Sequence, residues 1–118
     1  MNKGQYYEDL AADYLRQAGL FVLERNFCCR VGEIDIICSQ GEQLVFVEVR
    51  YRSNGNFGSA AASVNRNKQH KIIKAAQLYL QLKRQYSNRS CRFDVVAIAP
   101  LQSVDEVDVQ WLQNAFIS

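Results

Sequence analysis

The sequence predicts an α/β fold in which a mixed β-sheet is flanked by helices. Two segments, residues 3–18 and 64–85, repeat apolar residues at helical spacing. Three segments of strand type lie between them and a fourth follows the second helix. That helix is long enough to cross a sheet, so the fourth strand can return parallel to a strand of the preceding hairpin. The length of 118 residues suits one domain, residues 1–118.

Residues 3–18 are predicted to form the first helix because their apolar side chains make one stripe. The stripe consists of Tyr7, Leu10, Ala11, Tyr14, Leu15 and Ala18. Gly19 is a suitable end for this helix, since glycine readily takes the left-handed conformation that follows a last turn. Residues 20–27 then predict a first strand.

Residues 34–38 and 44–51 predict two strands of a hairpin, joined around residues 39–42. An even loop places Ser39 opposite Glu42 and Asp35 opposite Phe46. Because side chains alternate along a strand, Asp35 and Glu48 then share one face and lie diagonally across from each other. Arg50, two residues after Glu48, points to the same side.

The second half of the chain supplies a helix and two more strands. Residues 53–62 are small and polar and predict a loop. Residues 64–85 predict a long helix that turns Val64, Ile72, Ala75, Ala76, Tyr79 and Leu82 toward the core. Residues 91–99 predict the fourth strand, ended by Pro100. Residues 107–116 predict a final edge strand with a short helical tail.

Composition excludes several classes of protein. The longest apolar stretches are far shorter than the roughly 20 residues that cross a bilayer, so we expect no membrane partner. The N-terminus carries acids where a secretory signal carries an apolar core. The four cysteines lack the close pairing of a zinc knuckle. Reduced thiols and a cytoplasmic location are therefore predicted.

Charge is segregated along the chain, although the net charge is only +2. Residues 49–93 hold ten basic side chains and no acid, whereas the flanking segments are both net acidic. The bases are Arg50, Arg52, Arg66, Lys68, Lys71, Lys74, Lys83, Arg84, Arg89 and Arg92. We expect a basic surface that binds a polyanion, and nucleic acid is the obvious one. The alternative is that these bases pair with acids from the flanking segments.

Asp35 and Glu48 are the candidate chemical groups. Both lie in apolar strands, where an unpaired carboxylate costs several kcal/mol. Two carboxylates on one sheet face repel each other unless a cation joins them, and such oxygen ligands suit Mg²⁺ or Mn²⁺. The alternative is a structural ion pair of Arg50 with Asp35 or Glu48. Asp94 is expected to pair with Arg92 and not to bind metal.

The chain resembles a narrow group of small bacterial proteins, the YraN-like family, within the PD-(D/E)XK nuclease superfamily. The matching pieces are Gly4 with Glu8, Asn26, residues 32–35 (GEID), residues 45–52 (VFVEVRYR), Phe57-Gly58, Lys68 and residues 92–94 (RFD). The resemblance implies a restriction-endonuclease-like core of order αβββαβ and metal-assisted phosphodiester hydrolysis. Asp35, Glu48 and the carbonyl of Val49 would bind the metal, and Glu8 would complete or bridge the site.

One position departs from the superfamily pattern, because Arg50 stands where a lysine is usual. Arginine keeps its proton near neutral pH, so Arg50 cannot activate water, but it can hold a phosphate. Lys68 is expected to contact phosphate, with a migrated catalytic lysine as the alternative. The expected nucleic-acid contacts are Arg52, Arg66, Lys68, Lys71 and Lys74.

The sequence therefore predicts a nucleic-acid-binding protein that acts as a divalent-metal-dependent nuclease, with DNA favoured over RNA. Analogy of fold adds the expectation of structure-selective action on DNA, such as the resolution of junctions. Two other functions stay open. One is a non-catalytic nucleic-acid-binding module with a degraded active site. The other is an interaction protein whose basic helix docks an acidic partner. A homodimer also stays open.

Overall fold

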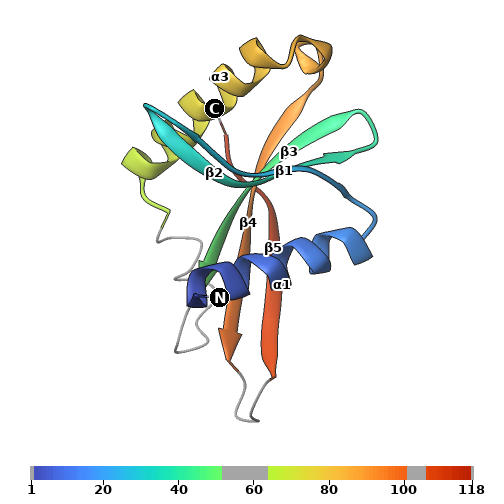
Figure 1. Cartoon of the computed structure of the whole chain (residues 1–118), viewed down its shortest axis with the longest axis vertical. Coiled ribbons are helices and arrows are strands. Elements are labelled where there is room, and N and C mark those ends of the chain that lie inside the picture. The colour runs from blue at the N-terminus through green and yellow to red at the C-terminus, as the bar shows by residue number, and fades with distance from the viewer. Residues whose placement is uncertain (1, 52–63, 101–105, 118) are drawn as a thin grey trace.

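The computed structural model describes residues 2–51, 64–100 and 106–117, and in them the chain forms an α/β fold (Figure 1). Five strands lie in the sheet in their sequence order, and all neighbours are antiparallel except β3 and β4. This mixed sheet with its two helices confirms the predicted fold class and is compatible with a restriction-endonuclease-like core. The elements are α1 (Lys3–Gln17), β1 (Phe21–Cys29), β2 (Gly32–Gln40), β3 (Gln43–Tyr51), α3 (Arg66–Leu82), the 3₁₀ turn η1 (Arg84–Tyr86), β4 (Cys91–Pro100) and β5 (Val107–Phe116).

The two helices pack on opposite faces of the sheet, as alternation along β3 requires. Phe46 belongs to the apolar cluster that contains Ile72 and Tyr79 of α3. Val45 and Val47 belong to the cluster that contains Leu15 of α1. Because β3 is central, its side chains are buried on both faces of the sheet. This burial explains why its sequence is nearly continuously apolar.

Capping residues set the beginnings of both helices. The side chain of Asn2 accepts a hydrogen bond from the backbone N–H of Gln5, and Asn65 does the same for Lys68. The second helix ends at Leu82, three residues earlier than predicted. Leu82 is 62% exposed, so its predicted place in the core is wrong. The other five core positions predicted for this helix segment are buried.

The register of the β2–β3 hairpin differs from the prediction by two residues. Gln40 pairs with Gln43 and Ser39 with Leu44, so the turn contains two residues and begins at Gly41. Gly41 has a φ of 58°, a left-handed conformation that glycine adopts without strain. The predicted pairing of Ser39 with Glu42, and with it that of Asp35 with Phe46, is therefore wrong. A slip of two residues preserves the face of every side chain.

Residues 107–116 form a full strand, and no helical tail is present in the described part of this segment, contrary to the prediction. Buried Asp94 fixes this strand to β4, accepting hydrogen bonds from the indole N–H of Trp111 (2.7 Å) and the backbone N–H of Asn114 (2.9 Å). Arg92 bonds both oxygens of Asp94, which confirms the predicted ion pair.

Two further predictions concern residues 52–62 and the absence of a membrane-spanning segment. The predicted loop at residues 53–62 and the predicted nucleic-acid contact Arg52 lie outside the described residues. None of the described helices is both long and apolar enough to span a membrane.

Candidate active site

Asp35 and Glu48 meet where the β2–β3 ladder ends. The last paired residues are Ile36 and Val47, and one more step in this register brings Asp35 opposite Glu48. Beyond that point the backbone N–H of Val49 donates to Asp35 Oδ2 at 2.8 Å. The carboxylate of Asp35 is thus held beside the strand that carries Glu48, and the shared face predicted for the two residues is present.

Two cations reach Glu48 from different elements. Its side chain is nearly buried, and its Oε2 lies 3.1 Å from Nη2 of Arg50 and 3.7 Å from Nζ of Lys68. Arg50 follows on the same face of β3, whereas Lys68 comes from the first turn of α3. The ion pair of Arg50 with Glu48, foreseen as an alternative to a metal site, therefore exists. Within the described residues, Asp35 is in no ion pair.

Glu8 of α1 is held by two side chains of β1. Arg25 donates to Glu8 Oε1 at 3.0 Å through Nε, and Asn26 donates to the same oxygen at 3.0 Å through Nδ2. Arg25 also pairs with Asp9. Asn26 has a φ of 54°, a left-handed conformation that asparagine tolerates better than most side chains. These contacts fix Glu8 at the edge of the site.

A surface hollow of about 410 Å³ joins two of these groups, but Glu48, Arg50 and Lys68 are not among its lining residues. Glu8 and Asp35 both line it, although they come from α1 and β2. The whole lining is Asn2, Gly4, Gln5, Glu8, Asn26, Glu33, Asp35 and Val49. The hollow is thus open to solvent and lined by acidic and polar groups, as a site for a hydrated cation requires.

Burial, and next the charge of Glu48, raises the pKa of Asp35 from 3.8 to about 7. The hydrogen bond from Val49 opposes this rise. Burial likewise raises the pKa of Glu8, while Arg25 acts in the other direction. Within the described residues, Arg50 and Lys68 pair with Glu48, whereas no cation pairs with Asp35. A further cation beside Asp35 would therefore reduce the repulsion between the two carboxylates.

The donor set fits a magnesium or manganese ion in part. Within residues 2–51, 64–100 and 106–117, no three His, Cys, Asp or Glu side chains form a ready-made metal cluster. Mg²⁺, however, commonly binds one or two carboxylates and keeps several waters. Asp35 and Glu48 are two such carboxylates, although only Asp35 lines the hollow, together with Val49. Glu8 differs from Asp35 in that its Oε1 is already engaged by Arg25 and Asn26.

Comparison with known proteins places the chain in a family. The model of the family described as "Uncharacterised protein family UPF0102" matches residues 7–98. The chain belongs to this family. It is 51% identical to the UPF0102 protein of Vibrio campbellii, over 95% of this chain and 89% of the relative. It is 52% identical to that of Aeromonas hydrophila, over 98% and 85%. It is 48% identical to that of Stutzerimonas stutzeri, over 99% and 96%.

The region matched to UPF0102 includes the whole candidate site from Glu8 to Lys68 and leaves β5 outside it. Sequence reasoning missed Arg25 as a partner of Glu8, because only the packing of α1 on β1 brings them together. Asn26 carried a signal, since an asparagine within a strand often marks a left-handed residue.

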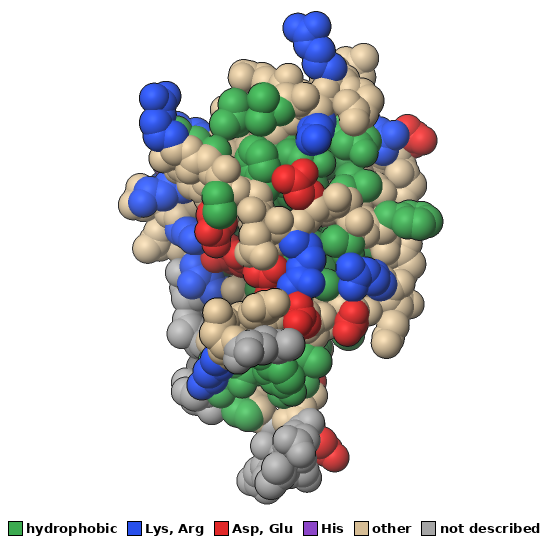
Figure 2. Space-filling view, viewed as in Figure 1, with side chains coloured by type: hydrophobic (Ala, Val, Ile, Leu, Met, Phe, Trp, Pro, Cys, Tyr) green, Lys and Arg blue, Asp and Glu red, His purple; other side chains and the backbone are tan. Residues whose placement is uncertain are grey.

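The acid-free segment divides between two environments. Arg89 and Arg92 lie near Glu42 and Asp94, which fits the alternative of ion pairs with flanking acids. Arg66, Lys71 and Lys74 are exposed on the first half of α3. Lys71 lines a hollow together with Lys68, whereas Arg66 lines another hollow, next to the end of β5. Figure 2 shows Lys and Arg side chains gathered at this side of the molecule, next to a group of acidic side chains. The basic surface is therefore smaller than the sequence indicated.

Proposed function

We propose that this UPF0102 protein is a divalent-metal-dependent nuclease that acts on DNA. The observation that carries the proposal is the convergence of Asp35 and Glu48 with Lys68 and Arg50 where the β2–β3 ladder ends. Paired carboxylates can hold a divalent ion for phosphodiester hydrolysis, and a lysine or an arginine can stabilise the charge of the phosphate. The basic first half of α3 beside them supplies attraction for the phosphate backbone.

Asp35, Glu48 and the carbonyl of Val49 would hold Mg²⁺ or Mn²⁺. When bound, the ion acidifies a water molecule and offsets negative charge on the scissile phosphate. The chain contributes rigidity: the bond from Val49 N–H fixes Asp35, and Arg25 with Asn26 fixes Glu8. A site held in this way places the reacting groups before the substrate arrives.

Lys68 and Arg50 take different roles because their chemistry differs. Arginine does not release a proton near neutral pH, whereas a lysine amine can orient a water molecule and accept its proton. Lys68 Nζ lies 3.7 Å from Glu48 Oε2, so it is at the carboxylate pair. We assign water activation to Lys68, once it has released to solvent the proton that it holds beside Glu48, and binding of the scissile phosphate to Arg50. Helix α3 thereby supplies the lysine that β3 lacks.

A second candidate function is non-catalytic binding of nucleic acid. The observation that favours it is the close pair of Arg50 with Glu48, which already neutralises one expected metal ligand. In that case Asp35 and Glu48 would be structural groups, and the basic residues of α3 would still bind phosphates. A third function is docking of an acidic protein partner on α3. It is distinguished from both nucleic-acid functions because DNA would then show no salt-dependent binding.

A cleavage panel tests the proposal. Wild-type protein is incubated with duplex, flap, four-way junction and single-stranded DNA in Mg²⁺, in Mn²⁺ and in EDTA. We expect cleavage of at least one substrate with metal and none with EDTA. Lys68→Ala is expected to lower the rate by about 10²-fold or more. Asp13→Asn, an exposed substitution on α1, is the matched control and should leave it unchanged. DNA binding without cleavage in either metal supports the binding module and refutes the nuclease.

A further inference from the structure

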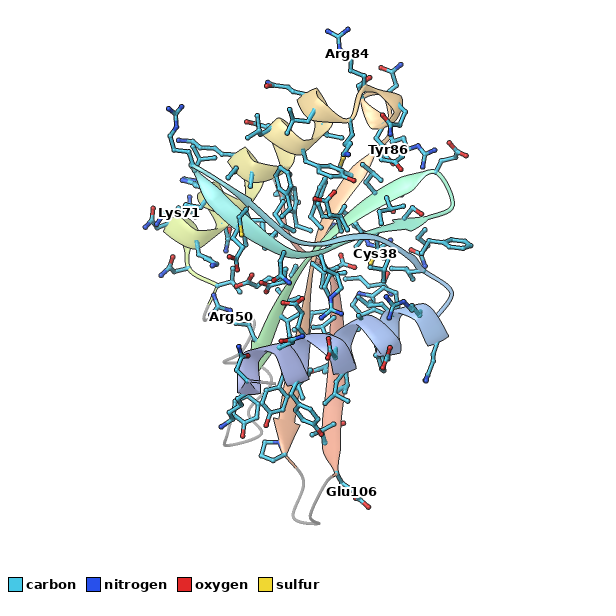
Figure 3. All side chains as sticks on the ribbon, in the orientation of Figure 1. Cys38, Arg50, Lys71, Arg84, Tyr86 and Glu106 are labelled. Atoms are coloured by element: carbon cyan, nitrogen blue, oxygen red, sulfur yellow. The ribbon has the colours of Figure 1, made fainter. Side chains whose placement is uncertain are left out.

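The β1–β2 turn, Arg30 and Val31, forms an exposed ridge packed against α3. A Cβ at the next residue, Gly32, would lie only 2.7 Å from the carbonyl oxygen of Lys71. Such a distance means that the strand backbone touches the helix backbone with no side chain between them. In Figure 3, Lys71 lies beside the end of this hairpin. The ridge is therefore seated directly on the basic part of α3.

A hollow lies on each flank of the ridge, and lysines line both. One hollow, of about 440 Å³, contains Lys68 and Lys71. The other, of about 340 Å³, contains Lys74. Arg30 and Val31 line both hollows, so the ridge separates them. Among the described residues, Arg30 has no acidic side chain within ion-pair distance. The ridge thus carries the cation of Arg30, and the hollows on its two sides carry the cations of Lys68, Lys71 and Lys74.

This pattern complements a double helix better than a single strand. A duplex groove is bordered by two phosphate backbones, which match lysines on the two flanks of a ridge. Single strands bind instead along a basic channel with aromatic side chains for stacking. The hollow with Lys71 is lined otherwise by Cys28, Cys29, Gly32 and Glu33, and that with Lys74 by Gln77, Leu78 and Gln81. Neither lining includes an aromatic residue.

The ridge adjoins the candidate active site. Glu33 lines both the hollow that contains Asp35 and the hollow that contains Lys71. Lys68 lines the latter hollow and also reaches Glu48. We propose that the β1–β2 ridge binds a duplex arm of the substrate next to the cleaved phosphate, with Arg30 over a groove and Lys71 and Lys74 on the two backbones. This inference rests on the proposed function, because it names the substrate class of that site.

Binding without cleavage tests the ridge. Fluorescence anisotropy is measured in EDTA with a labelled duplex of about two helical turns and with one of its strands alone. Arg30→Ala is expected to weaken duplex binding about tenfold and to reduce the slope of log affinity against log salt by about 0.9. Single-strand binding should change by less than about twofold. Arg30→Lys, which keeps the charge, should recover most of the duplex affinity.

Arg84→Ala is the matched control, since it removes the same exposed charge in η1, just beyond the C-terminal end of α3 and away from Arg50 and Lys71 (Figure 3). It should change neither affinity by more than about twofold. Three results would each overturn the proposed role of the ridge. They are an Arg30→Ala variant that loses as much affinity for single strand as for duplex, an Arg84→Ala variant that weakens duplex binding as much as Arg30→Ala does, and a wild type that does not bind duplex at all. A protein that cuts no DNA yet shows the duplex-specific loss keeps the ridge and refutes the nuclease. A protein that cuts DNA while Arg30→Ala binds duplex normally refutes the ridge alone.

Discussion

Replacing Asp35 with asparagine should stabilise the metal-free protein at pH 8 and remove its response to metal. Asparagine has nearly the same shape, and its Oδ1 can still accept the hydrogen bond that Val49 N–H gives Asp35 at 2.8 Å. Its amide can also donate to Glu48, where the aspartate presents a second negative charge. The substitution therefore removes the repulsion within the site and keeps the backbone contact.

The magnitude follows from the pKa of Asp35, which burial and then Glu48 raise from 3.8 to about 7. Each pKa unit corresponds to about 1.4 kcal/mol, so ionising Asp35 in the folded chain costs up to about 4 kcal/mol. The folded state holds this proton more tightly than the unfolded state, so wild-type stability falls as pH rises from about 4 to 7. We expect the variant to exceed wild type by about 2 to 4 kcal/mol at pH 8 and to match it at pH 4.

Urea denaturation in EDTA, followed by the fluorescence of Trp111, measures this difference at each pH. Asp13→Asn, which removes an exposed carboxylate paired with Arg16, should change stability by less than about 0.5 kcal/mol at either pH. Adding Mn²⁺ at 100 times its dissociation constant should stabilise wild type by about 2.7 kcal/mol and leave Asp35→Asn unchanged. A variant less stable than wild type at pH 8, or equal stabilisation of both by Mn²⁺, would refute the reasoning.

Three further outcomes are expected. Asp94→Ala should lower the free energy of unfolding by about 3 to 5 kcal/mol in urea denaturation, because it leaves Arg92 without its partner in a partly buried site. Arg50→Lys should keep or raise the cleavage rate in a gel assay, since lysine restores the usual residue at that position. Replacing Lys68 and Lys71 together with glutamate should weaken DNA binding alike for all sequences in anisotropy titrations, because it reverses two charges on the basic first half of α3, which attracts the phosphate backbone.

The parts of the fold that the sequence predicted are those that local periodicity determines. Alternation along β3 placed Phe46 and Glu48 on one face and Val45 and Val47 on the other, as the two apolar clusters require. The shared face of Asp35 and Glu48 followed from the parity of the hairpin loop alone. It survived the error in register, because a shift of two residues changes no face.

The remaining parts of the site depend on contacts between distant elements. Lys68 reaches Glu48 only because α3 begins beside the end of β3, and periodicity carries no information on that approach. Arg25 reaches Glu8 across the packing of α1 on β1. Leu82 has the helical spacing of a core residue, but α3 ends there and the side chain is exposed. Each of these facts is tertiary, so the local sequence could not predict it.

The most direct test of the nuclease is to compare cleavage and binding by Asp35→Asn with those of wild type on the same labelled DNA. Cleavage is followed in Mn²⁺, and affinity is measured in EDTA. Wild type is predicted to cut, and the variant to lose cleavage while its affinity stays within about twofold, because Asp35 lies outside the basic surface. A variant that cuts as fast as wild type, or a wild type that cuts nothing in Mn²⁺, would contradict the assignment of Asp35 and Glu48 as the metal site.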